Sequence, residues 1–493
     1  MDLARTLRAA VERDPSAPAI VDGDRRLCYA EWMERIERAA AGLQATGVRE
    51  RDRVLAVLRN GEPMATVYWA TQLIGATFTP VNWRLSQDEL AFIATDAEPA
   101  CIVVDPEVDV RLEGAIVCGD LLSCRAQRHV APALTGESYS IMLYTSGTTG
   151  RPKGVLRTHR AERAAAIAHI VQNRYAPRER TLGVMPLYHT MGVRSLIAMA
   201  MLNGTFVAMP RWNPQDALRI LEDERITNLY LAPTLYYDLL SQPAIDRSDL
   251  RALRKIGFAG APMTPALVER CFTRFEPDIF VNHYGSTEIY TFTINDDLRR
   301  KPASAGRAGF NERIRVVRDR ASGPHALCAP NETGEIVADL GSPEAFSGYW
   351  RRPDAEARAI QDGWYFTGDA GAFDEDGDLF VLGRVDDMII TGGENVYPGE
   401  IEDVLARCPA IGRIAVVGMP DERLGQKIVA FVEPRDPRTT ADELELYARG
   451  CGMTLFKRPR EYIFVEEIPQ SPSGKILRTK LRAGEYQRVR IPS

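Results

Sequence analysis

The stretch YTSGTTGRPKGV, residues 144–155, contains three Gly, three Thr and one Ser, with Lys153 near its end. Glycine lets the main chain approach an anion closely, hydroxyl groups donate hydrogen bonds, and the lysine adds positive charge. The apolar run before it, residues 140–145, predicts a strand, and residues 158–175 predict a helix. Because open α/β sheets bind ligands in loops at strand ends, the stretch predicts a phosphate-binding loop rather than a mobile linker.

The stretch does not fit the common nucleotide-binding P-loop, which has the pattern GxxxxGK[ST]. Counting from Gly147, the sixth position holds Pro152 instead of glycine. Glycine, rather than serine or threonine, follows Lys153. With two defining positions wrong, the P-loop interpretation fails, and the loop indicates another class of phosphate-binding protein.

Short apolar runs alternate with helical patterns along most of the chain, which is typical of parallel sheets covered by helices. The strands predicted are residues 52–58, 100–105, 255–260 and 279–284, with a helix and then a strand over 214–233 and a helix over 265–275. Shorter strands over 334–340, 363–369 and 378–384 indicate a small β subdomain. The acidic run 374–378 lacks the terminal glutamate of a calcium loop and predicts a β-turn.

The pattern changes after about residue 385. The elements predicted there are helices over 398–407 and 440–451 and strands over 414–419 and 427–434. Such a compact α+β unit can fold as a separate domain. The predicted fold class is therefore α/β. A large N-terminal domain of helix-covered, mainly parallel sheets plus the β subdomain (residues 1–385) precedes a small mobile α+β domain (residues 386–493).

Composition excludes several classes of protein. A net charge of −6 and a pI near 5.8 argue against a nucleic-acid binder, which needs a basic excess. The eight Cys include no CxxC pair and the six His no HExxH motif, so no zinc site is indicated. The charged N-terminus does not read as a signal peptide, and no apolar run approaches a membrane span. These observations predict a cytoplasmic protein with small-molecule ligands; a homodimer stays open.

The stretch at 144–155 resembles the phosphate-loop signature of the adenylate-forming superfamily, which comprises acyl-CoA synthetases, peptide-synthetase adenylation domains and luciferases. Further motifs of that superfamily follow in order: MPLYHTMG (185–192), FAGAP (258–262), YGSTE (284–288), GWYFTGD (363–369), GRVDDMIITGGENVYPGEIE (383–402) and PSGK (472–475). The resemblance covers essentially the whole chain. It is strongest to the aryl-CoA ligases that act on halobenzoates.

The resemblance implies a reaction in two steps with ATP, Mg²⁺ and coenzyme A. A carboxylate first attacks the α-phosphate of ATP, which gives acyl-AMP and pyrophosphate, and a thiol then displaces AMP. The first step brings two anions together, so it needs cations and hydrogen-bond donors. The alternatives are an enzyme that loads a fatty acid or other carboxylate onto a carrier protein, and a non-catalytic nucleotide-binding sensor or scaffold.

The resemblance also implies the nucleotide site. The residues expected to hold the β- and γ-phosphates are Thr145, Ser146, Gly147, Thr148, Thr149 and Lys153. Those expected around the adenosine and α-phosphate are Gly260, Ala261, Pro262, Tyr284, Thr287, Asp369 and Arg384. Glu288 is expected to hold Mg²⁺, although a lone glutamate is more often a solvated side chain. A carboxylate such as Asp369 can accept hydrogen bonds from both ribose hydroxyls.

Lys475 in PSGK is expected to bridge the reacting carboxylate and the α-phosphate; the alternative is one more lysine in a basic tail. Asp386 matches the hinge of the superfamily, about which the C-terminal domain rotates after adenylation, and Asp387 could share that role. The rotation would bring in the loop around Gly393, where a pantetheine arm can pass.

By the same resemblance, coenzyme A is expected to meet Arg84, Phe456 and Arg458. Each of these could equally be an ordinary surface residue. Leu424 departs from the aryl-CoA ligases, which have an aromatic residue there against the CoA adenine. No carrier segment follows the last domain, which favours free CoA as the acceptor.

His189 in MPLYHTMG is expected at the acyl end of the site, with a buried structural histidine as the alternative. The candidate residues of the acyl pocket are Thr190, Met191, Tyr236, Phe258, Tyr290 and Phe292. Their bulk predicts a short, flat pocket for an aromatic or cyclic acid, although cores use the same residues. If Arg194 faces this pocket, a substrate with a second carboxylate fits as well.

Overall fold

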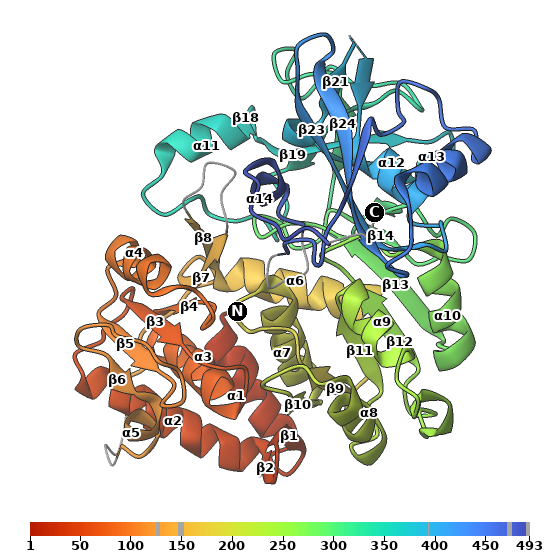
Figure 1. The fold of residues 1–493 in the computed structure, drawn as a ribbon. Coiled ribbons are helices and arrows are strands. Elements are labelled where there is room, and N and C mark those ends of the chain that lie inside the picture. Colours follow the sequence, from red (N-terminus) through yellow and green to blue (C-terminus); the bar gives the residue numbers. More distant parts are fainter. Residues whose placement is uncertain (125–128, 146–151, 393, 471–475, 490–493) are drawn as a thin grey trace.

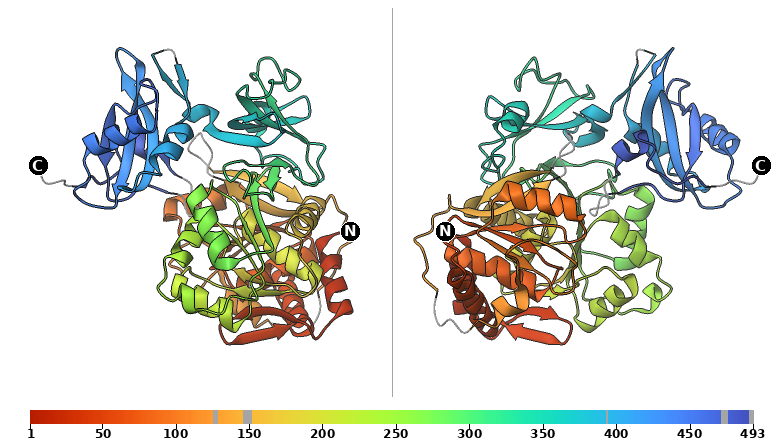
Figure 2. Two further views of the ribbon diagram at one scale, coloured as in Figure 1. Left: turned by 90° about the vertical axis from the view of Figure 1, so that its right-hand side faces the viewer. Right: turned by 60° about the vertical axis from the view of Figure 1, so that its left-hand side comes forward.

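The computed structural model describes residues 1–124, 129–145, 152–392, 394–470 and 476–489. Its mainly parallel sheets and covering helices confirm the expected fold class (Figure 1). The β subdomain and the C-terminal part lie side by side above the large body, as both views in Figure 2 show. None of the described helices combines the length and apolar composition needed to cross a bilayer.

The largest described sheet has nine strands. In spatial order these are β15 (Arg307–Ala308), β14 (Thr293–Asn295), β13 (Ile279–Tyr284), β12 (Lys255–Phe258), β11 (Asn228–Leu231), β9 (Arg180–Gly183), β10 (Thr205–Ala208), β1 (Pro18–Asp22) and β2 (Arg25–Cys28). The pairs from β13 to β1 are parallel. Several of these strands are buried on both faces, which explains their continuous apolar runs.

The second sheet has six strands. In spatial order these are β6 (Ile116–Val117), β5 (Cys101–Val104), β3 (Arg53–Val57), β4 (Thr77–Pro80), β7 (Tyr139–Thr145) and β8 (Lys153–Thr158). The strand β8 corrects the sequence analysis, which expected a strand-to-helix loop after residue 145. Residues 153–158 are mostly buried and pair antiparallel with β7, so the phosphate loop joins two paired strands.

The described helices are α1 (Leu3–Arg13), α2 (Tyr29–Ala45), α3 (Glu62–Ile74), α4 (Gln87–Ala97), α5 (Cys118–Leu122), α6 (His159–Gln172), α7 (Thr190–Leu202), α8 (Pro214–Asp223), α9 (Pro233–Leu240), α10 (Pro265–Phe275), α11 (Pro353–Ala359), α12 (Pro398–Leu405), α13 (Ala441–Gly450) and α14 (Arg478–Arg482), with 3-10 helices η1 (Ile245–Arg247) and η2 (Val385–Asp387). Helices α3 and α7 are buried almost throughout. Their side chains share one core with residues of both large sheets, such as Phe78 and Phe206.

The β subdomain has strands β16 (Ile314–Val317), β17 (Gly334–Asp339), β18 (Ile360–Gln361), β19 (Trp364–Phe373) and β20 (Leu379–Arg384). Strands β17, β19 and β20 correspond to the three short strands that the sequence predicts, whereas β16 and β18 were not predicted. All their described pairings are antiparallel. The long strand β19 carries Asp369 toward the end of β20.

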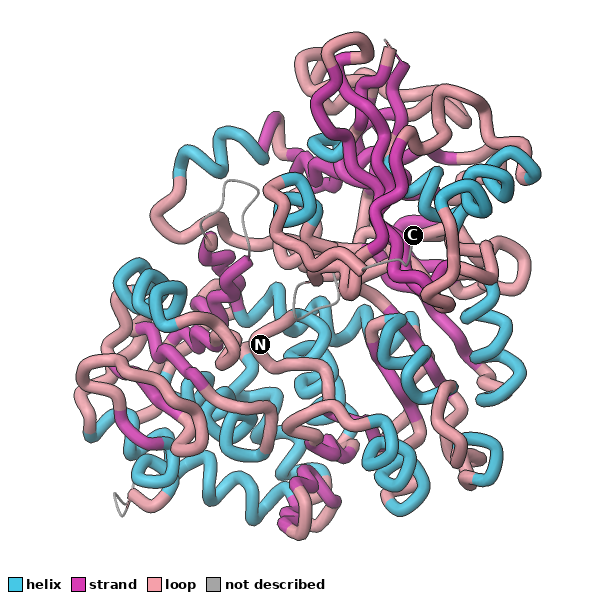
Figure 3. Tube along the Cα trace, in the orientation of Figure 1, coloured by secondary structure: helices cyan, strands magenta, loops and turns pink. Residues whose placement is uncertain are grey.

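The C-terminal domain is a third architecture, with strands β21 (Ile389–Thr391), β22 (Glu394–Val396), β23 (Ile411–Asp421), β24 (Gly425–Pro434) and β25 (Glu461–Phe464). Side chains alternate across its sheet, as strand geometry requires. Val416 and Val432 pack with α12 and α13 on one face, and Val417 and Phe431 pack with α14 on the other. Figure 3 shows α12 and α13, in cyan, beside these strands. The boundary at residue 385 stays a prediction.

Candidate active site

Two predicted motifs lie at neighbouring strand ends of the large sheet. Strands β12 and β13 are parallel neighbours, with Phe258 opposite Asn282. The segment Gly260–Pro262 follows the carboxyl end of β12, and Tyr284 ends β13. Gly260 has a φ of 88°, in the left-handed region that glycine adopts readily. The two motifs therefore share one edge of the sheet, where α/β proteins bind ligands.

The phosphate loop begins and ends on paired residues. Thr145 and Lys153 are directly opposite each other on β7 and β8. The predicted phosphate ligands Ser146, Gly147, Thr148 and Thr149 lie outside the described residues. The Lys153 ammonium is 4.2 Å from the ring centre of Tyr349. Burial lowers the pKa of Lys153, and the nearby Glu288 carboxylate offsets part of that shift.

Tyr349 connects the phosphate loop to the predicted magnesium ligand. Its hydroxyl donates a hydrogen bond of 2.6 Å to Oε1 of Glu288. The main chain around it pairs with β8, through Leu156 N to Gly348 O and Trp350 N to Gly154 O. Burial and the Glu288 charge raise the pKa of Tyr349, so its hydroxyl stays a donor. Sequence reasoning missed this tyrosine, whose signal is only the short aromatic run GYW after a turn.

The carboxyl group of Glu288 fits the chemistry of a magnesium site. Mg²⁺ in phosphate-binding enzymes is held by one or two carboxylates together with phosphate oxygens and water. Glu288 is the acidic residue of the YGSTE loop, and Tyr349 occupies only one of its two carboxylate oxygens. Glu288 and Lys153 thus place one carboxylate and one ammonium group beside each other, the two charges that a magnesium–phosphate group requires.

Arg157 holds the YGSTE loop against β8. Its fully buried guanidinium donates from Nη1 to the carbonyl oxygens of Thr287 and Glu288, at 3.1 Å each. It is paired with the buried carboxylate of Glu162 at 2.5 Å and lies 3.6 Å from the ring centre of Tyr290. The two chain segments expected to hold phosphate and metal are therefore connected through one side chain. The sequence analysis did not single out Arg157.

Asp369 joins the β subdomain to the end of β13. Its carboxylate accepts 2.6 Å and 2.8 Å hydrogen bonds from the Tyr284 hydroxyl and Arg384 Nη1, respectively. Arg384 also donates to the carbonyl oxygen of Thr367 at 2.8 Å. At Gly368 an added Cβ would lie 2.5 Å from Arg384 Nη2, and φ is 72°. Three residues expected around the adenosine thus form one cluster, and glycine is required beside it.

His189 begins the buried helix α7. Its imidazole Nδ1 accepts from the backbone N–H of Met191 at 3.4 Å, as an N-cap. The next turn approaches its own entry loop so closely that a Cβ on Gly192 would lie 2.3 Å from the Pro186 carbonyl oxygen. Burial, with a smaller effect of Arg194, lowers the pKa of His189 to about 4. The imidazole is therefore neutral near pH 7. Thr190 and Met191 beside it are buried.

Three predicted pocket residues are packed as core residues. The Tyr236 hydroxyl donates to the Gly257 carbonyl oxygen at 2.8 Å, and its ring belongs to the core around α8, α9 and α10. Phe258 packs edge-on against Phe280. Phe292 packs between Tyr284 and Tyr365. This packing alone accounts for their bulk, and a role for these three residues in the acyl pocket stays a prediction.

The residues expected to bind CoA are not brought together by any contact between described residues. Arg84 is exposed and lies 4.2 Å from the ring centre of Trp83, which Arg211 also faces at 5.3 Å. Phe456 is exposed on the C-terminal domain. Arg458 instead donates to the Met453 carbonyl oxygen and pairs with Glu445. Its packing alone accounts for its position, so a CoA role for it stays a prediction.

The predicted hinge lies between two anchored residues. Arg384 is bonded to Asp369, whereas Asp387 accepts from Arg482 of α14 at 2.8 Å. Between them, Val385 and the exposed Asp386 are held by no side-chain contact that the structure records. Pivoting at Asp386 stays a prediction. The predicted adenylation residue Lys475 and the predicted pantetheine-loop residue Gly393 lie outside the described residues.

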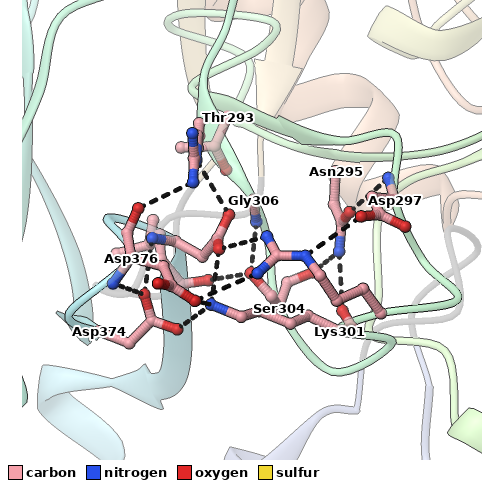
Figure 4. Close-up of polar contacts among 12 residues, drawn as sticks. Thr293, Asn295, Asp297, Lys301, Ser304, Gly306, Asp374 and Asp376 are labelled. Carbon is pink, nitrogen blue, oxygen red and sulfur yellow. Dashed lines mark hydrogen bonds and ion pairs between the residues drawn. The ribbon is translucent and has the colours of Figure 1, made fainter.

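The acidic run at 374–378 forms a turn, as predicted (Figure 4). Asp374, Asp376 and Asp378 are close enough to suggest a cation site. The ammonium of Lys301 pairs with all three carboxylates, and Arg300 pairs with Asp376 and Asp378. A lysine thus takes the place of a metal ion and connects this hairpin to the loop after β14.

Two family descriptions match the chain. Residues 7–350 match the AMP-binding enzyme family, and residues 400–475 match the AMP-binding enzyme C-terminal domain. Because the first match covers more than half of the chain, it establishes the family. The resemblance found in the sequence motifs is confirmed.

Curated relatives align over almost their whole length. A feruloyl-CoA synthase from Amycolatopsis sp. is 34% identical over 95% of this chain and 96% of its own. A 4-chlorobenzoate–CoA ligase from Arthrobacter sp. is 32% identical over 96% and 93% of the two chains. A long-chain-fatty-acid–CoA ligase from Mycobacterium tuberculosis is 31% identical over 97% of each. These relatives share a reaction and differ in the acid they activate.

Solved structures show the same fold. ATP-bound MatB from Rhodopseudomonas palustris superposes with a TM-score of 0.89 and 28% identity, over 98% of this chain and 99% of that one. The o-succinylbenzoate–CoA synthetase from Bacillus subtilis, in complex with ATP and magnesium ion, gives 0.87 and 27% over 97% and 98%. With the nucleotide-site motifs in place, the chain belongs to the AMP-binding enzyme family and is an AMP-forming acyl-CoA synthetase.

Proposed function

We propose that this synthetase activates an aromatic or cyclic carboxylic acid of benzoate-like shape and transfers the acyl group to coenzyme A. The carboxylate attacks the α-phosphorus of ATP, and the bond to pyrophosphate breaks, leaving an acyl adenylate. The thiol of CoA then attacks the acyl carbon, and AMP leaves. Activation is needed because a carboxylate would have to expel oxide, whereas AMP is a far better leaving group.

Each described part of the site has one proposed role. Thr145 and Lys153 hold the terminal phosphates of ATP, together with the loop that they bracket. Glu288 holds Mg²⁺, which when bound neutralises phosphate charge. Tyr284 and the Gly260–Pro262 segment contact the adenine.

Asp369 and Arg384 hold the ribose, and Thr287 donates to the α-phosphate. His189, neutral near pH 7, orients the reacting carboxylate by hydrogen bonding. Lys475 bridges that carboxylate and the α-phosphate, which offsets the repulsion between two anions.

The observation that carries the proposal is the placement of Lys153 and Glu288 around the one side chain of Tyr349. The ammonium lies on the Tyr349 ring, and the carboxylate accepts from its hydroxyl. A cation and a single carboxylate at the base of a phosphate loop suit a magnesium–triphosphate group. This arrangement supports nucleotide activation more directly than binding alone, since a scaffold needs no metal ligand at the phosphates.

Two aromatic rings beside Arg194, which lies on the helix that His189 begins, support a cyclic acid. Tyr230 and Tyr290 are buried, and both lie within 6.0 Å of the guanidinium of Arg194, five residues after His189 on α7. Flat rings offer stacking and edge contacts to a substrate ring. Feruloyl and chlorobenzoyl relatives favour the same class of acid, whereas the fatty-acid relative keeps an aliphatic acid as the competing outcome.

The test is AMP release from ATP with and without CoA, over a panel of benzoates, hydroxy- and halobenzoates, cyclohexane carboxylates and fatty acids. CoA-dependent turnover with highest kcat/KM for a ring acid is the expected result. Highest turnover with fatty acids would contradict the substrate class. Pyrophosphate release that CoA does not convert into AMP release would favour a carrier protein as acceptor.

A further inference from the structure

A second buried arginine lies on the same helix as the proposed acyl-site residue His189. Arg194 is 1% exposed and projects from α7, five residues after His189. Its Nη1 donates to the hydroxyl of Thr291 at 2.5 Å, and its Nη2 donates to the hydroxyl of Tyr230. Its guanidinium carbon is 5.0 Å from the ring centre of Tyr230 and 6.0 Å from that of Tyr290. All its polar contacts are with neutral groups.

The positive charge of Arg194 has no counter-ion in the part of the chain that the structure describes. No described carboxylate lies within 4.0 Å of its nitrogen atoms, and its Nε has no hydrogen-bond partner there. Glu344 is also buried, and the Arg194 charge lowers its pKa, but the carboxylate accepts from Asn311 and burial, the largest effect, raises that pKa. An unpaired buried charge is strongly destabilising, so such groups persist mainly where a ligand uses them.

The surroundings of Arg194 contain further unused polar atoms. The rings of His169 and His283 pack edge-on or tilted against Tyr230 and each other. Asn173 contacts one nitrogen of each imidazole, and the other nitrogens, His169 Nε2 and His283 Nδ1, are unpartnered among described residues. Burial lowers the pKa of both imidazoles well below its usual range, with Arg194 lowering it further. Both rings are therefore neutral and cannot balance the guanidinium charge.

Three motifs of the proposed active site frame this cluster. His283 immediately precedes Tyr284 at the end of β13, Thr291 follows the YGSTE loop by three residues, and Arg194 continues the helix that His189 begins. Arg194 is near enough to His189 for its charge to lower the pKa of that imidazole. The buried groups around the guanidinium are hydroxyls and imidazoles, whereas a hydrocarbon tail would need apolar ones.

We propose that Arg194 binds a second carboxylate at the far end of the acyl substrate, so that the preferred acid is an aromatic dicarboxylate. One carboxylate is adenylated, and the other replaces the missing counter-ion of Arg194 in a charge-assisted, fork-like pair. The inference rests on the proposed function and narrows its substrate class. It leaves the two half-reactions unchanged.

Matched pairs of acids test it. Isophthalate and 3-methylbenzoate, terephthalate and 4-methylbenzoate, and 2-succinylbenzoate and 2-butyrylbenzoate differ in the carboxylate that Arg194 would bind. In the wild type, at least one diacid should exceed its partner in kcat/KM for AMP formation by about 100-fold or more, since a buried polar group left unpaired is costly. A preference for the monoacid in every pair would overturn the inference.

Variants localise the effect. Arg194→Met should remove the diacid preference, with the diacid losing about 100-fold and the monoacid changing less than about threefold. Arg194→Lys keeps the positive charge and should retain part of the preference for the diacid. It serves as the test variant if the methionine variant does not fold. The control Arg299→Met removes a surface guanidinium that also lies on a ring, that of Phe272, and should change neither acid. Equal losses on both members of a pair would assign Arg194 a structural role.

The outcome also separates this inference from the proposed function. Turnover led by a monocarboxylic ring acid would keep the proposed function and remove the role of Arg194. Turnover led by fatty acids, or pyrophosphate release without any CoA-dependent AMP, would remove the proposed function itself.

Discussion

Two buried arginines face Tyr290, Arg157 on β8 and Arg194 on α7. Different kinds of groups surround their two charges. Arg157 is paired with Glu162 and donates to two backbone carbonyl groups. Arg194 meets only hydroxyl groups and has an unpartnered Nε among the described residues. A guanidinium that is paired with a carboxylate can serve as scaffold, because breaking the pair leaves a second charge buried; Nη2 of Arg157 nevertheless has no partner among the described residues. A guanidinium without a carboxylate partner is more useful to a ligand than to the fold.

The largest expected effect of a substitution is the loss of stability when Arg157, which is paired with Glu162, is replaced. Arg157→Met should lower the free energy of unfolding by about 3–5 kcal/mol, because Glu162 would remain buried without its partner. Urea unfolding followed by tryptophan fluorescence measures this change. The double variant Arg157→Met, Glu162→Met should recover most of the loss, and no recovery would show that the pair is not the cause.

A pH series tests whether the buried carboxyl group of Glu312, which lies near Arg157, keeps its proton in the folded protein. Burial and Glu344 raise the pKa of Glu312 to about 8. Native Glu312 therefore keeps its proton between its unfolded value of 4.5 and about 8, whereas the unfolded chain releases it. The free energy of unfolding should fall as the pH rises through this window, by about 5 kcal/mol relative to Glu312→Gln. Parallel stability curves for the wild type and this variant would contradict the shift.

Tyr349→Phe tests whether the Tyr349 side chain positions Glu288 beside Lys153. Losing the hydroxyl removes the hydrogen bond that orients Glu288 but keeps the ring under Lys153. The Mg²⁺ concentration for half-maximal pyrophosphate release should rise about 10-fold or more, as for other groups that orient metal ligands. Thioester formation from supplied acyl-AMP should be nearly unchanged. An equal loss in both half-reactions would indicate a general structural defect.

The smallest expected effect is the change in the free energy of unfolding when Arg194 is replaced. Arg194→Met leaves no carboxylate unpaired, so the free energy of unfolding without substrate should stay within about 1 kcal/mol of the wild type or increase. The same urea titration measures it beside Arg157→Met. Similar destabilisation by the two substitutions would erase the distinction between scaffold and ligand-binding arginines.

The secondary structure and the motif positions could be read from the sequence because both depend on local patterns. Helix α10 and strand β13 have the bounds that the sequence predicts, 265–275 and 279–284. Strand β8 was not predicted. Its polar ends and the Gly-rich loop before it were interpreted as one long loop that leads into the helix at 158–175.

Contacts between distant residues could not be read from one sequence. Tyr349 meets Glu288, and Arg157 meets the YGSTE loop, through side chains separated by 61 and more than 100 residues. The aromatic residues Tyr236, Phe258 and Phe292 were interpreted as a substrate wall because size does not distinguish a lining residue from a core residue. Arg194 was singled out, but only the structure shows that no carboxylate of the described residues pairs with it.

The ammonium group of Lys301, held by three aspartates, has a consequence for how this enzyme responds to its surroundings. A covalently attached cation cannot be removed by a chelator or depleted when divalent ions are scarce. The connection between the β19–β20 hairpin and the loop after β14 is therefore permanent rather than conditional. Divalent ions therefore have no part in holding this connection together, and any metal dependence of the enzyme belongs to the magnesium site proposed at Glu288.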